Sequence, residues 1–99
     1  MPAPRKLIWT RRASEDVARL REFIQPYHPA AAKRAARRIQ EAASLLLEQP
    51  AIGRPVLELP EYRDLFIPFG SRGYVLRYRL EGDTVVIVRV WHFREARTE

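Results

Sequence analysis

The sequence predicts an α+β domain in the order β-α-α-β-β-β, with an N-terminal helical hairpin packed on a small, mostly antiparallel sheet. Two observations lead to this class. Apolar residues recur at helical spacing in the first half of the chain, and the last third is rich in β-branched and aromatic residues bounded by turn signals. The 99 residues and the hydrophobic fraction of 46% suit one compact domain over residues 1–99.

A short strand and a first helix are predicted at the start of the chain. Lys6–Trp9 is apolar and β-prone, so we expect it to join the sheet. Thr10 is placed to cap the helix that follows, and Glu15 and Asp16 lie in its early turns, where the helix dipole favours acidic side chains. The buried stripe of this helix is expected to be Ala13, Val17, Leu20, Ile24 and Tyr27.

A second helix is predicted from about residue 30 to residue 48, after a proline-bounded break at residues 26–29. Its many alanines indicate close packing. The inner face is expected to be Ala32, Ala35, Ala36, Ile39, Ala43 and Leu46. The basic residues of this helix fall on the solvent side, and we interpret them as a solvated face: Lys33, Arg34, Arg37 and Arg38.

The second half of the chain predicts a loop and three strands. Two prolines and Gly53 predict a loop over residues 50–60. A strand is expected over residues 62–68, followed by a turn at residues 70–73. The chain then ends in a hairpin whose strands cover residues 73–80 and 84–94.

The loop of this hairpin decides which side chains share a face of the sheet. We expect a loop of three residues, Glu81 to Asp83, which pairs Leu80 with Thr84, because a two-residue loop would mix charge into both faces. The expected core side is Tyr74, Leu76, Tyr78, Leu80, Val86, Val88, Val90 and His92. The expected open side is Val75, Arg77, Arg79, Ile87, Arg89 and Trp91.

The charge balance indicates an acidic partner. Eighteen basic residues against twelve acidic ones give a net charge of +6, and sixteen of the eighteen are arginine, which suits bidentate contacts to phosphate or carboxylate. Such a partner could be nucleic acid, a nucleic-acid machine or an acidic protein, although arginine can also be abundant because a genome is GC-rich. Without cysteine and with two histidines, we expect no cofactor and no metal site. We also expect a cytoplasmic location without membrane contact.

An ordered set of motifs resembles the toxins of the RelE/ParE superfamily from bacterial type II toxin–antitoxin systems, and their ParE-like branch in particular. The match extends over nearly the whole chain. The motifs are Trp9-Thr-x-x-Ala13-x-x-Asp16-Val17, Leu46-x-x-x-Pro50-x-x-Gly53, Tyr62-Arg63, Gly73-Tyr74-x-x-x-Tyr78, Val86 to Val90, and His92-Phe-Arg94.

This resemblance implies a toxin that a cognate antitoxin neutralises in a hetero-oligomer. ParE-like members inhibit DNA gyrase by protein contact, whereas RelE-like members cut mRNA on the ribosome without a metal. We expect the gyrase inhibitor, because Val75 and Phe93 stand where nuclease relatives carry arginine and tyrosine. The alternatives are a ribosome-dependent mRNA endonuclease, which would make the chain an enzyme, and an inactive toxin that retains only antitoxin binding.

Candidate site residues follow from these alternatives. No catalytic residue is expected in a gyrase inhibitor, but RNA cleavage needs proton-transfer groups and cations, for which His92, Arg63 and Arg77 are the candidates. Contact with the target or the antitoxin is expected from Arg63, Arg77, Arg79, Arg89, Trp91, Arg94 and Arg97. Each has a structural alternative: arginine stems covering Trp91, an ion pair from Arg63 to Asp64 or Glu61, a backbone hydrogen bond at His92, and a frayed basic tail.

Overall fold

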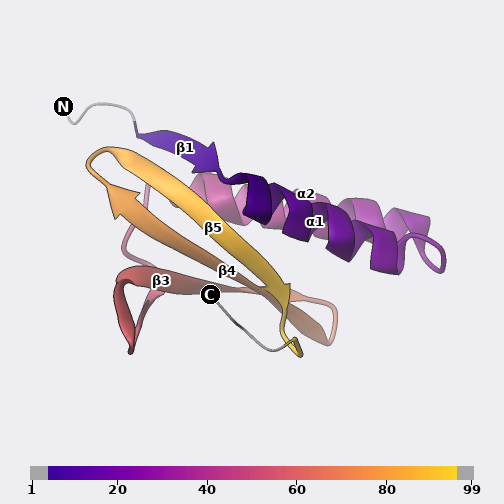
Figure 1. Ribbon diagram of the computed structural model, residues 1–99. Helices are drawn as coiled ribbons and strands as arrows, with labels where there is room; N and C mark the ends of the chain where they lie inside the picture. The colour runs from indigo at the N-terminus through magenta and orange to yellow at the C-terminus, as the bar shows by residue number, and fades with distance from the viewer. Residues whose placement is uncertain (1–4, 96–99) are drawn as a thin grey trace.

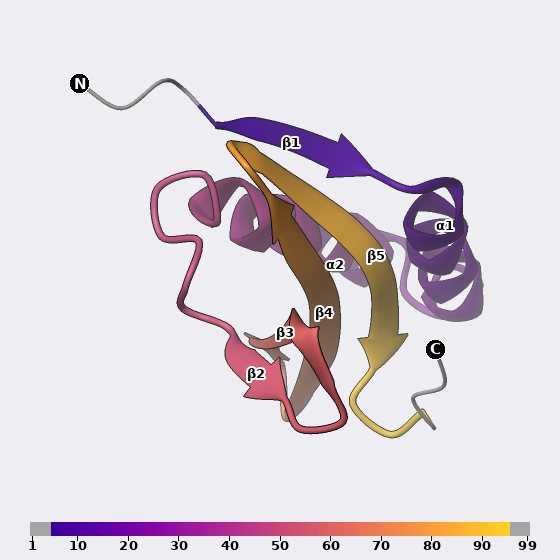
Figure 2. The ribbon, with the colours of Figure 1, turned by 60° about the vertical axis from the view of Figure 1, so that its left-hand side comes forward.

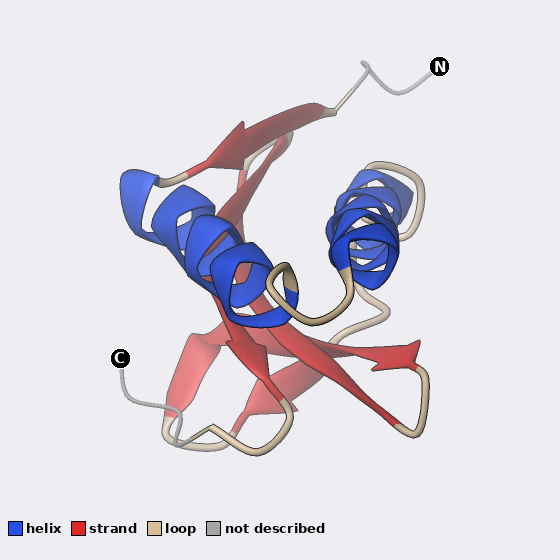
Figure 3. Ribbon diagram, turned by 90° about the vertical axis from the view of Figure 1, so that its right-hand side faces the viewer, coloured by secondary structure: helices blue, strands red, loops and turns tan. Residues whose placement is uncertain are grey.

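The computed structural model describes residues 5–95 and confirms the α+β class (Figure 1). Two helices lie side by side against one face of a five-stranded sheet (Figures 1 and 3). The elements are β1 (Lys6–Trp9), α1 (Arg11–Ile24), α2 (Pro29–Leu45), β2 (Arg54–Val56), β3 (Leu59–Phe69), β4 (Arg72–Glu81) and β5 (Thr84–His92). Among these residues no helix is long and apolar enough to span a membrane.

The strands are ordered β1-β5-β4-β3-β2, so the first and last strands of the chain are neighbours (Figure 2). β1 runs parallel to β5, and the other pairs are antiparallel, which confirms a mostly antiparallel sheet. β2 was not expected, because residues 50–60 were predicted to be loop. Its Pro55 lacks a backbone N–H, which an edge strand tolerates.

The helices begin and end close to where the sequence predicts. Thr10 caps α1, its Oγ1 accepting a hydrogen bond from the Ala13 N–H at 3.1 Å. The expected place of Tyr27 in the buried stripe is wrong: α1 ends at Ile24, and Tyr27 lies in the following turn with 78% of its surface exposed. The inner face of α2 is confirmed, with Ala32, Ala35, Ala36, Ile39, Ala43 and Leu46 all buried.

The predicted hairpin loop is wrong. Glu81 pairs with Thr84, so the loop has two residues, and Gly82 supplies at φ +59° the positive φ that such turns need. A β-bulge then shifts the register, since Arg77 pairs with Arg89 while Tyr78 pairs with Ile87. The extra residue on β5 is therefore Val88.

The bulge decides which side chains reach the core. Before it, the faces are as expected, with Leu76 and Val90 inside and Arg77 and Arg89 on the other side. After it, Ile87 joins the core cluster, although it was expected on the open side. Val86 and Val88, expected in the core, belong to the opposite face, where both are still buried.

Candidate functional site

The outer face of the β4–β5 hairpin, turned away from the helices, was expected to be an open arginine surface, and this expectation is wrong. Arg77 is 6% exposed, Arg89 7% and Trp91 2%. The structure does bring these three residues together on one face, as predicted, although the register that places them there differs from the predicted one. It places them under the surface, however, where a bound partner would not meet them directly.

Two carboxylates and one indole hold these arginines. Nε and Nη2 of Arg77 donate to the two carboxylate oxygens of Asp64 at 2.8 and 3.0 Å, and Arg89 makes the corresponding pair with Asp16 at 2.8 and 3.3 Å. The guanidinium carbons lie 5.0 Å (Arg77) and 4.7 Å (Arg89) from the Trp91 ring centroid. We call Asp16, Arg89, Trp91, Arg77 and Asp64 the buried ladder; it connects α1 to β3 across the hairpin.

Asp16 reaches the ladder because α1 continues along the edge of β5 where β1 stops. The Thr10 N–H donates to the Ile87 carbonyl at 3.0 Å, and six residues later, close to two helical turns, Oδ2 of Asp16 accepts the Val90 N–H at 2.9 Å. Sequence reasoning placed Asp16 at the helix dipole and missed this role. The available signal was its spacing: Asp16 lies on the same stripe as Ala13 and Leu20, and a buried carboxylate there requires a partner.

Arg63 and Arg79 lie apart from the ladder. Nη1 of Arg63 donates to the carbonyls of Gly53 at 2.7 Å and Ala51 at 3.2 Å. An ion pair between Arg63 and Asp64 is thus wrong, since Asp64 pairs with Arg77. Arg79 is partly exposed and lies 3.3 Å from Glu81.

The loop that accepts the Arg63 hydrogen bonds, at Ala51 and Gly53, is also held by Tyr78 from the core side. The Tyr78 hydroxyl donates to the Pro50 carbonyl at 2.7 Å and accepts the Gly53 N–H at 2.9 Å. A Cβ at Gly53 would lie 2.7 Å from the Tyr78 ring, so a glycine is needed for this close approach. Burial raises the pKa of Tyr78 and keeps its hydroxyl a donor.

His92 makes the backbone contact that was its structural alternative. Its Nδ1 accepts the Arg94 N–H at 3.2 Å, and its ring lies edge-on to Tyr74 with centroids 5.7 Å apart. Tyr74 belongs to the helix-side core, whereas Arg77 faces the other way. The three candidate nuclease residues, His92, Arg63 and Arg77, therefore do not converge on one point.

An exposed groove adjoins the ladder. Its walls include two aromatic rings, Phe66 and Phe93, packed edge-to-face with centroids 5.7 Å apart and exposed by 49% and 54%. The groove has a volume of about 470 Å³ and is lined by Arg54, Pro55, Asp64, Phe66, Val75 and Phe93, which we call the aromatic groove. Sequence reasoning named Phe93 but missed Phe66, whose strand was placed without its register. Arg94 is exposed beside Phe93, and Arg97 lies outside the described residues.

A second groove of about 750 Å³ lies between α1 and the β3–β4 turn. Its apolar and aromatic lining is Leu20, Phe23, Ile24, Phe69 and Tyr74, and polar groups come from His92, Arg19, Glu22, Arg72 and Glu95. Phe23 is 79% exposed at its rim. Exposed apolar side chains grouped in grooves are typical of surfaces that bind other proteins, and this chain has them on both sides of the sheet.

A helical hairpin packed on one face of a small, mostly antiparallel sheet agrees with the type II toxin class that the motifs predicted. The chain matches the family described as ParE toxin of the type II toxin–antitoxin system, parDE, over residues 7–97. It belongs to this family, within the RelE/ParE superfamily.

Individual relatives agree with this assignment. Toxin RelE1 of Caulobacter vibrioides is 41% identical over 86 residues, covering 87% of this chain and 90% of that protein; Toxin RelE3 of the same organism is 38% identical over 86 residues, covering 87% and 91%. The chromosomal ParDE system from P. aeruginosa superposes with a TM-score of 0.77 at 25% identity over 91% of this chain and 97% of that chain. The toxin–antitoxin complex RelBE2 from Mycobacterium tuberculosis superposes with a TM-score of 0.65 at 27% identity. The match covers 91% of this chain and 99% of that chain.

Proposed function

We propose that this toxin inhibits DNA gyrase by protein contact and is neutralised by a cognate antitoxin. The observation that carries this function is the neutralisation of the sheet arginines. Cleaving RNA without a metal requires cations free to meet the phosphorane charge. Arg77 and Arg89 are instead buried in ion pairs with Asp64 and Asp16. Withdrawing Arg89 from its pair leaves the buried Asp16 carboxylate uncompensated, at a cost of about 3–5 kcal/mol, and withdrawing Arg77 leaves the partly exposed Asp64 at a smaller cost.

The proton-transfer groups that RNA cleavage needs are also poorly placed. A general base must reach the 2′-hydroxyl, and a general acid must reach the leaving oxygen. His92 packs against Tyr74 on the helix side of the sheet, and Tyr74 is only 2% exposed, so neither residue is placed with Arg77 on the outer face. These features favour a contact surface over an active site.

We place the contact on the aromatic groove and its rim. Phe66 and Phe93 supply exposed apolar area, and of the candidate contact arginines Arg94 is exposed and Arg79 is partly exposed. Arg77, Arg89 and Trp91 are buried, so they would contribute indirectly, through the ion pairs that connect β4 and β5 to β3 and α1. Arg63 would also contribute indirectly, because its guanidinium holds the preceding loop through the Gly53 carbonyl. The second groove, on the other side, gives a long antitoxin segment a further apolar surface to cover.

The runner-up is a ribosome-dependent mRNA endonuclease. Its support is the naming of the Caulobacter relatives as RelE toxins and the two exposed phenyl rings, which could stack on bases.

Two assays on purified toxin separate these functions. Gyrase supercoiling should fall with added toxin and recover when the antitoxin is added in equal amount. Toeprinting on translating ribosomes should show no codon-spaced cuts. Codon-spaced cuts with unimpaired supercoiling would overturn the gyrase function, and antitoxin binding without either effect would indicate an inactive toxin.

A further inference from the structure

The outer face of α2 carries a cluster of cations that the gyrase contact does not use. Lys33, Arg34, Arg37 and Arg38 are all exposed, while the opposite side of the helix is the buried alanine face. Two of these residues recur one turn after the other two, so all four project from adjacent turns of one rigid element. We define these four residues as the basic face of α2.

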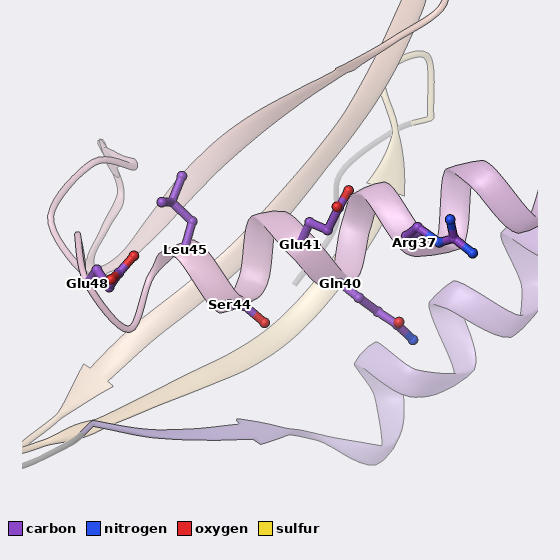
Figure 4. Close-up of a pocket in the computed structure, with 6 residues that line it drawn as sticks. All are labelled: Arg37, Gln40, Glu41, Ser44, Leu45 and Glu48. Atoms are coloured by element: carbon purple, nitrogen blue, oxygen red, sulfur yellow. The ribbon is translucent and has the colours of Figure 1, made fainter.

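This basic face lacks internal neutralisation. Within residues 5–95, no carboxylate lies within ion-pair distance of any of the four, and α2 has no acidic residue in its first turn. Figure 4 shows the carboxylate of Glu41, one turn further on, standing apart from the Arg37 guanidinium. Like charges at i and i+4, as at Lys33 and Arg37, destabilise a helix. The cluster therefore disfavours folding of the chain on its own.

The chemistry of the surroundings distinguishes between kinds of anion. A protein interface places apolar side chains at its centre, whereas on α2 the large apolar side chain that is exposed, Leu45, lies seven residues beyond Arg38, at the end of the helix. Interfaces with nucleic acid are instead polar and strongly positive. Three of the four are arginine, which binds phosphate oxygens in bidentate fashion.

We propose that the basic face of α2 binds the phosphate backbone of a double-stranded nucleic acid. Such binding would be independent of sequence, because phosphate contacts carry no base information. It would lie on the helix side of the molecule, away from the aromatic groove. A toxin could therefore hold a duplex and its protein target at the same time.

The test measures affinity for a labelled 20-base-pair duplex by fluorescence anisotropy at several salt concentrations, using the full chain. Four phosphate contacts predict a slope of log K against log salt of about −3.6. The variant K33Q/R34Q/R37Q/R38Q should bring the slope close to zero, since glutamine keeps helix propensity and removes charge. Circular dichroism and antitoxin binding verify that the variant is folded.

A matched control separates the site from net charge. K6Q/R11Q/R12Q/R21Q also removes one lysine and three arginines, all exposed and without an ion-pair partner among residues 5–95. It should keep most of the slope. Equal losses in both variants would overturn the proposal, as would equal competition by polyglutamate. Parallel titrations with DNA and RNA duplexes of one sequence identify the source: whichever binds more tightly is the ligand.

Discussion

The arginines at the centre of the sheet and those of α2 have the same side chain but differ in burial and in ion pairing. Arg77 and Arg89 are buried, each 2.8 Å from a carboxylate oxygen, and both stack on Trp91. Arg34, Arg37 and Arg38 are exposed, with no carboxylate within ion-pair distance among the described residues. The comparison teaches that a basic composition does not locate a binding surface. What matters is where the fold leaves the charge without a partner.

The largest effect should come from breaking the ladder at Asp16. Asp16→Ala leaves Arg89 buried without this carboxylate and the Val90 N–H without its acceptor, so the free energy of unfolding should fall by about 3–5 kcal/mol. Urea denaturation measures the change. Glu15→Ala, at the exposed neighbouring position, should change the stability by less than about 0.5 kcal/mol. Similar stability in both variants would mean that the ladder is not structural.

A smaller loss is expected at the other end of the ladder. Asp64 is partly exposed, with 23% of its side chain accessible, so water can solvate Arg77 when the carboxylate is removed. Asp64→Ala should therefore cost about 1–3 kcal/mol by the same measurement. The variant also tests the nuclease alternative, because it releases a cation on the outer face from its ion pair. Codon-spaced cuts that appear or increase in toeprinting would favour that alternative.

The aromatic groove should affect binding more than folding. Phe66→Ala and Phe93→Ala remove half-exposed rings, so we expect roughly a tenfold or greater loss of gyrase inhibition with little change in stability. Leu57→Ala is the control, since Leu57 is 98% exposed outside the groove and its loss should leave inhibition unchanged. Full inhibition by both phenylalanine variants would contradict the placement of the contact.

The smallest effect concerns the basic face, and it should have the opposite sign. Lys33→Glu replaces the like-charge pair with Arg37 by an acid–base pair in the favourable orientation, so the free energy of unfolding should rise by about 0.5 kcal/mol. Thermal unfolding at low salt can detect this as a higher Tm. A variant with a higher Tm and a lower affinity for duplex would show that the charge of Lys33 lowers the stability of α2 and contributes to duplex binding. A lower Tm would mean that Lys33 has a structural partner.

Much of the fold was predictable because its signals are local. The cap at Thr10, the alanine face of α2 and the prolines around the helical turn all act within a few residues, and each lies where expected. The hairpin was harder. Gly82-Asp83 favours a two-residue loop, which the structure has, whereas the separation of charge between the two faces favours three residues. The β-bulge at Val88 also keeps the charged side chains off the core face, because it shifts the register of β5 by one residue. No residue type in this part of β5 indicates a bulge.

The site was less predictable than the fold. The sequence by itself determined the order of elements except for β2, the toxin family, and the grouping of Arg77, Arg89 and Trp91 on one side of the hairpin. Only the tertiary structure decided that these residues are buried. The partner of Arg89 lies 73 residues away in Asp16, and that of Arg77 lies 13 residues away on the neighbouring strand. Periodicity reports which face a side chain takes, whereas its exposure depends on what the rest of the chain brings to that face.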